Sequence, residues 1–83
     1  MRLLYFAWVK EKVGIAAEEI DPPAGVATIA ELIDWLKARG PEFENAFARS
    51  EVIRAAIDKH HVPHDARIDG AREIAFFPPV TGG

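Results

Sequence analysis

The chain has no cysteine among its 83 residues. Disulfide bridges, thiolate metal sites and cysteine nucleophiles are therefore excluded. Basic residues are also few, because 10 Lys and Arg stand against 13 Asp and Glu, which gives a net charge of −3. A nucleic-acid binder needs a basic stripe that neutralises phosphates, so we expect no nucleic-acid partner.

Long apolar segments are lacking as well. The run near the N-terminus, Leu3 to Val9, ends at Lys10 and is far shorter than the roughly 20 apolar residues that a membrane span needs. It is followed by no obvious small-residue cleavage site, which disfavours a secretion signal. We expect a cytoplasmic protein without a membrane partner.

What is present is the composition of one small globular domain, with 49% hydrophobic and 28% charged residues. Periodicity and turn residues predict strands over 2–9, 15–20, 52–58 and 73–77, a helix over 28–39, a short helical turn over 41–49, and an irregular segment over 59–67. The order leaves room for one more short strand before the last one. The helix is the clearest element. Thr28 and Glu31 have the spacing of a capping box, and an apolar stripe follows at Ile29, Leu32, Ile33 and Leu36.

One amphipathic helix can cover one face of a sheet, so the element order predicts a two-layer α+β domain. We expect a mixed sheet of four to five strands, with the last strand beside the first, as in the ubiquitin-like β-grasp arrangement. Residues 1–78 would form this domain, and residues 79–83 would form an extended, flexible tail.

The last six residues are Pro78, Pro79, Val80, Thr81, Gly82 and Gly83. The two prolines end the last strand and extend the chain, and glycines without a Cβ can thread a channel that is too narrow for other residues. The group that arrives at the tip is an α-carboxylate. Adenylation by ATP in a partner enzyme would make this carboxylate reactive toward a sulfur donor, which gives a thiocarboxylate, or toward an amine, which gives an isopeptide bond.

The closing motif from Ala75 to Gly83 resembles that of the sulfur-carrier small subunits of molybdopterin synthase, a ubiquitin-like β-grasp family. The opening segment 3–7 and the helix start 28–32 are similar to the same family. The resemblance implies that the Gly83 carboxylate is adenylated, converted to a thiocarboxylate, and used to donate sulfur to cyclic pyranopterin monophosphate in molybdenum cofactor biosynthesis. Pro79, Val80, Thr81 and Gly82 would thread the active site of the partner.

The same resemblance implies partners: a large synthase subunit in a heterotetramer, an adenylating enzyme that uses ATP, and a sulfur donor protein. The chain would be an enzyme only as a synthase subunit, because its partners would supply the catalytic side chains. It would bind no cofactor and no metal itself. Alternatives are a ubiquitin-like protein modifier, a thiamine-pathway sulfur carrier with the same Gly-Gly terminus, and an interaction domain with an inert tail.

The side chains outside the last six residues indicate one partner-docking surface and no second functional site. Alternation places Phe6 and Phe77 on the sheet face away from the helix, where they would form a partner-docking surface. His60, His61 and His64 could suggest zinc, but their spacing and Pro63 favour a solvated loop. We interpret Glu18 and Glu19 as a solvated strand edge, and Trp8 and Trp35 as packing residues.

Overall fold

The structure, a computed structural model, describes residues 1–79. Within this part of the chain five strands form one sheet in the order β2-β1-β5-β3-β4. β5 is parallel to β1, and the other neighbouring pairs are antiparallel. The strands are β1 (Arg2–Tyr5), β2 (Ala17–Glu19), β3 (Arg54–Ile57), β4 (His60–Val62) and β5 (Glu73–Phe77).

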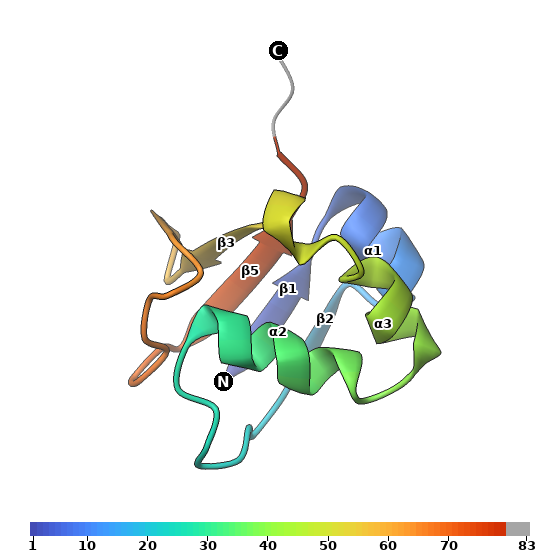
Figure 1. Cartoon of the computed structure of the whole chain (residues 1–83). Coiled ribbons are helices and arrows are strands. Elements are labelled where there is room, and N and C mark those ends of the chain that lie inside the picture. The colour runs from blue at the N-terminus through green and yellow to red at the C-terminus, as the bar shows by residue number, and fades with distance from the viewer. Residues whose placement is uncertain (80–83) are drawn as a thin grey trace.

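The main helix, α2 (Ile29–Lys37), lies across one face of the sheet (Figure 1). It begins at the predicted capping box: the Glu31 N–H donates to Thr28 Oγ1 at 3.2 Å, and the Thr28 N–H donates to Glu31 Oε1 at 3.1 Å. Two orphan backbone donors are thereby satisfied. The remaining helical segments are α1 (Ala7–Val13), α3 (Pro41–Ala46) and the 3-10 turn η1 (Ser50–Val52).

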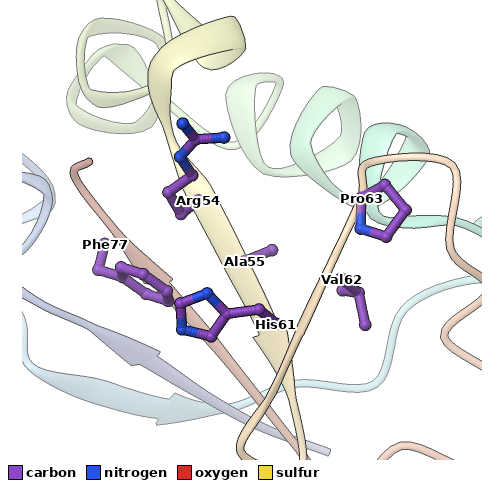
Figure 2. A pocket seen from close by; sticks show the side chains of 6 residues that line it. All are labelled: Arg54, Ala55, His61, Val62, Pro63 and Phe77. Atoms are coloured by element: carbon purple, nitrogen blue, oxygen red, sulfur yellow. The ribbon is translucent and has the colours of Figure 1, made fainter. Parts of the chain in front are cut away.

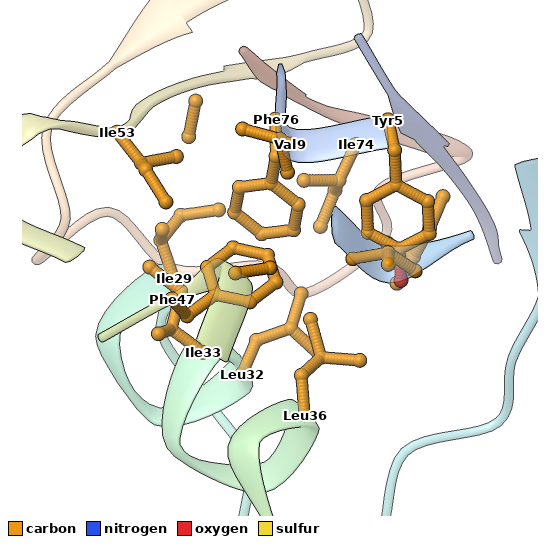
Figure 3. Close-up of a cluster of buried hydrophobic side chains, with 14 of the residues drawn as sticks. Tyr5, Val9, Ile29, Leu32, Ile33, Leu36, Phe47, Ile53, Ile74 and Phe76 are labelled. Carbon is orange, nitrogen blue, oxygen red and sulfur yellow. The ribbon is translucent and has the colours of Figure 1, made fainter. Parts of the chain in front are cut away.

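The core lies between α2 and the sheet (Figure 3). Phe76 from β5 has no exposed surface, and its ring centroid is 5.2 Å from that of Phe47, edge to face. The Tyr5 ring stacks on Phe76 at 6.4 Å and meets Phe47 edge to face at 6.5 Å, so the three rings form one cluster. The apolar stripe of α2 closes this layer with Ile29, Leu32, Ile33 and Leu36, all buried. The arrangement confirms the expected α+β class, with one main helix covering one face of a mixed sheet.

The first predicted strand was too long. Arg2–Tyr5 is a strand, but the chain turns at Ala7, whose φ is 53°, and residues 7–13 form α1. The apolar run changes its period at this point: Leu3 and Tyr5 are buried two residues apart, whereas Val9 and Val13 are buried four residues apart. A continued strand would also bury Ala7 and Glu11, which alternate onto the same face, but both are exposed, so the four-residue spacing is that of a helix.

The segment predicted as irregular, residues 59–67, contains the edge strand β4. It pairs with β3 through a tight turn at Asp58 and Lys59, whose φ angles are 48° and 74°. Such turns usually contain Gly or Asn, so the sequence offers little warning of a hairpin here. The Asp58 carboxylate steadies the turn, since its Oδ1 accepts from the Arg72 N–H at 3.1 Å and the Glu73 N–H at 2.9 Å. No helix within residues 1–79 is long and apolar enough to cross a membrane.

Candidate functional site

The end of β5 determines where the C-terminal segment leaves the domain. β5 is bonded on both sides, to β1 and to β3, and its last residue, Phe77, pairs with Arg54. Pro78 and Pro79 follow directly and are half-buried. A strand bonded on both edges is held firmly, so the base of the predicted tail starts from the most constrained part of the sheet. The predicted tail residues Val80, Thr81, Gly82 and Gly83 lie outside the described residues.

The sheet face opposite α2 is uncovered within residues 1–79, and the two predicted docking residues are on it. Tyr5 and Phe76 pair in register and point into the core, so the next residue of each strand lies on the opposite face. Phe6 is 47% exposed and Phe77 is half-buried. The Phe6 N–H donates to the Phe76 carbonyl at 3.1 Å, which carries the β1–β5 pairing one residue further. That these rings dock a partner stays a prediction.

The same face contains a smooth strip that the sequence reasoning did not identify. Its members are neighbours in register across all five strands and, apart from His61, carry small or aliphatic side chains: Ala17, Leu4, Ala75, Ala56 and His61. Short side chains let a partner backbone approach closely. The alternation in β5 and β3 was a signal for Ala75 and Ala56, but alanines draw little attention in a sequence.

A hollow opens next to Phe77 at the β3–β4 edge of this face (Figure 2). The His61 ring lies against the Phe77 ring, with centroids 5.1 Å apart and planes tilted by 54°. The rest of the hollow is lined by Arg54, Ala55, Val62 and Pro63. An aromatic pair beside an exposed guanidinium can receive an apolar side chain and a carboxylate together.

The three histidines are not brought together. The His60 Nδ1–H donates to the Asp58 carbonyl at 3.1 Å, and the His64 Nε2–H donates to the Ile53 carbonyl at 2.8 Å. His61 instead packs against Phe77. Across residues 1–79 no cluster of three potential metal ligands is found. The histidines therefore act in turns and packing, each with a partner of its own.

The interpretation of Glu18 as a solvated edge residue was wrong. Its carboxylate accepts from the Tyr5 hydroxyl at 2.7 Å and from both terminal nitrogens of Arg39 at 2.9 Å. The Glu18 side chain is only 15% exposed, and the Tyr5 side chain to which it bonds is buried. Glu19, its neighbour, is exposed as expected.

These contacts shift the ionisation of all three groups. Burial, reinforced by the bond to Glu18, raises the pKa of Tyr5. Burial alone would raise the pKa of Glu18, but the bonds from Arg39 and Tyr5 outweigh it and hold that pKa below its usual value. The bond to Glu18 raises the pKa of Arg39. The ion pair between Glu18 and Arg39 therefore joins the end of α2 to β2. These groups supply no acid or base near the tail.

Comparison with known proteins identifies relatives over the whole chain. The profile described as the ThiS family matches residues 3–83. The molybdopterin synthase sulfur carrier subunit of Escherichia coli is 34% identical over 83 residues, and the alignment covers 100% of this chain and 99% of that protein. The subunit of the same name from Haemophilus influenzae is 30% identical with the same coverage. Among solved structures, SAMP1 from Haloferax volcanii superposes with a TM-score of 0.74 at 25% identity, covering 100% of this chain and 98% of that one.

Proposed function

The chain belongs to the ThiS family, and from this premise we propose that it is the sulfur-carrier subunit of a molybdopterin synthase. The observation that carries the proposal is the position of the closing motif. The strand β5 passes directly into Pro78 and Pro79 beside an uncovered sheet face. A carrier needs this arrangement, since one rigid surface must hold the partner while an extended segment enters it.

In the proposed cycle the reacting group is the Gly83 carboxylate. One of its oxygens attacks the α-phosphorus of ATP in an adenylating enzyme, and pyrophosphate leaves. The outer sulfur of a persulfide on a donor protein then attacks the acyl carbon and displaces AMP, which gives an acyl disulfide. A thiol attacks the donor-side sulfur of this disulfide, so that the S–S bond breaks, a new disulfide remains with the donor, and the thiocarboxylate is released. The displaced oxygen leaves with AMP, and the thiocarboxylate is ionised and strongly nucleophilic at neutral pH.

The thiocarboxylated carrier would then dock on a large synthase subunit, and two such carriers would flank a dimer of large subunits. Pro79 to Gly82 would lie in the channel, and Phe6 and Phe77 would hold the domain at its mouth. Sulfur passes to cyclic pyranopterin monophosphate. In this scheme the chain contributes a surface and a terminus, its partners contribute the catalytic side chains, and ATP belongs to the adenylating enzyme. We expect the cycle to run in the cytoplasm, where ATP is available.

The test is the intact mass of the chain after incubation with ATP, the adenylating enzyme and the sulfur donor. We expect a gain of one oxygen-to-sulfur exchange, localised to Gly83 by fragmentation. The matched control is a chain lacking Gly83, which should stay unmodified while melting at the same temperature. An unchanged mass for the full chain under these conditions would overturn the carrier proposal.

A second candidate is protein modification, favoured by the likeness to SAMP1 and to a structure described as small archaeal modifier protein 1. The activated Gly83 would then form isopeptide bonds with lysine amines. Conjugates with a Gly83–lysine linkage in the native cells would support this candidate. A thiamine-pathway carrier would form the same thiocarboxylate, and the two carriers are separated by which precursor accepts the sulfur.

A further inference from the structure

A groove of about 430 Å³ lies on the helical side of the molecule, away from the open sheet face. We call it the Trp8 groove. Its walls come from α1 on one side and from α3 and η1 on the other. Trp8, Lys12, Asn45, Arg49 and Val52 line it, with two alanines between them.

The floor of the Trp8 groove is apolar and its rim is cationic. Trp8 is half-buried against the core, and the Lys12 ammonium lies 5.3 Å from the centroid of its ring. The Arg49 side chain is 77% exposed, and within residues 1–79 its one ion-pair partner is Glu51, at 3.3 Å. An ion pair exposed at both ends is weak, so Arg49 can exchange Glu51 for another carboxylate at little cost. Among residues 1–79, no carboxylate lies within ion-pair distance of Lys12.

The Trp8 groove lies close to the base of the C-terminal segment. Its α1 wall starts directly after Phe6, whose N–H bonds to the Phe76 carbonyl of β5. Its η1 wall leads into β3, where Arg54 pairs with Phe77. Figure 1 shows η1 and the start of α1 beside the end of β5. A protein that accepts the tail would therefore meet this groove as well as Phe6 and Phe77.

Charge is unevenly distributed between the lining of the Trp8 groove and the whole molecule. The lining contains Lys12 and Arg49 and no acidic residue, whereas the whole chain has 10 basic and 13 acidic residues. The groove is therefore a basic site on an acidic protein. Local charge of one sign steers a partner of the opposite sign during encounter.

We propose that the Trp8 groove receives an acidic segment of the protein that accepts the tail. A carboxylate of that segment would bind Lys12 and Arg49, and an adjacent apolar side chain would lie on Trp8. This rests on the proposed function and adds to it a second contact surface with a defined chemistry. A second copy of this chain is a poor occupant, because a two-fold dimer would bring Lys12 and Arg49 of both copies face to face. Nucleic acid is a poor occupant as well, because two cations on an acidic chain are too few to bind it.

The test measures association and dissociation rates between the full chain and the large synthase subunit encoded in the same genome. The variant Lys12→Glu/Arg49→Glu should associate about tenfold more slowly than the unsubstituted chain at low salt and lose most of its salt dependence. The matched control is Lys59→Glu/Arg72→Glu, which makes the same change in net charge at the far end of β5. It should associate within about twofold of the unsubstituted chain.

Trp8→Ala supplies an independent readout, because loss of an apolar anchor speeds dissociation, whereas loss of rim charge slows association. We expect dissociation about tenfold faster with association nearly unchanged, for a variant that still melts cooperatively. The inference is overturned if Lys12→Glu/Arg49→Glu associates like the unsubstituted chain, or if the control slows equally. If the unsubstituted chain does not bind the large subunit, the proposed function fails too, so the two failures are distinguishable.

Discussion

The two faces of β5 are built from the same five residues and have opposite roles. Ile74 and Phe76 point toward α2 and have no exposed surface. Glu73, Ala75 and Phe77 alternate with them on the uncovered face and are all half-buried. One face is therefore fixed by packing with the rest of the domain. On the other face no helix of residues 1–79 covers the side chains, so they are available to a partner.

The comparison shows how a small chain can serve stability and recognition with one strand. An 83-residue domain can bury only a small core. Every second residue of β5 lies outside this core, although the strand is at the centre of the sheet. Since the backbone bonds on both edges hold the strand, the open-face side chains contribute little to folding. Substitutions on the two faces should therefore have separable effects.

The largest effect is expected on the covered face. Phe76→Ala removes a ring that contacts both Tyr5 and Phe47, and the cavity should lower the free energy of unfolding by about 3–5 kcal/mol. Urea denaturation measures this change. A loss below about 1 kcal/mol would mean that the core does not depend on this side of β5.

The neighbouring substitution, Phe77→Ala, should act on binding. We expect it to weaken association with the large subunit by about 2 kcal/mol and to lower the free energy of unfolding by less than about 1 kcal/mol. Calorimetric titration and urea denaturation of the same sample measure both. Unchanged affinity together with a large loss of stability would place Phe77 in the core and remove the contrast between the faces.

The third prediction concerns the N-terminus of α2, the helix that covers one face of the sheet. Thr28→Ala removes the side-chain acceptor of the Glu31 N–H, and should cost about 1 kcal/mol of unfolding free energy. Thr28→Ser, which keeps the hydroxyl, is the matched control and should recover most of it. Equal losses in both variants would point to the methyl group rather than to the cap.

The smallest effect is expected at the other end of α2, where Arg39 bonds to Glu18. The Glu18 pKa is below its usual value of 4.5, so the bonded carboxylate adds stability above that pH, and the contribution is lost as the pH falls through the folded-state pKa. Glu18→Gln should cost about 0.5–1 kcal/mol at pH 7 and flatten the acid side of the stability profile. Thermal melts between pH 7 and pH 3 test this. A variant with an unchanged acid slope would contradict the role given to Glu18.

Local sequence signals correctly predicted the elements in which hydrophobic periodicity and capping residues indicate the same structure. Residues 73–77 form a strand with the expected faces, and the capping box and apolar stripe gave α2 within two residues of its end. The prediction failed at residues 7–13, where an apolar run fits both a strand and a helix. At His60–Val62 it left a short strand open, because a strand there depends on pairing with β3. In both places the deciding contact is distant in the sequence.

The candidate site likewise has parts that local sequence predicts and parts that arise only when separate elements come together. Phe6 and Phe77 follow from alternation along single strands, and the Pro-Pro and Gly-Gly pairs follow from local chemistry. The strip through Leu4, Ala75 and Ala56 arises only when three strands come into register. The Trp8 groove needs α1, whose first residues lie in an apolar run that predicts a strand.

Residues close together in the chain were enough to predict the α+β class, the main helix, the last strand and the chemistry expected of the closing motif. Tertiary packing was needed to bond Glu18 to Tyr5 and Arg39, to separate the histidines, and to form a basic groove beside the end of β5. These features join residues from different elements, and their energies exist only once the sheet and helices have packed.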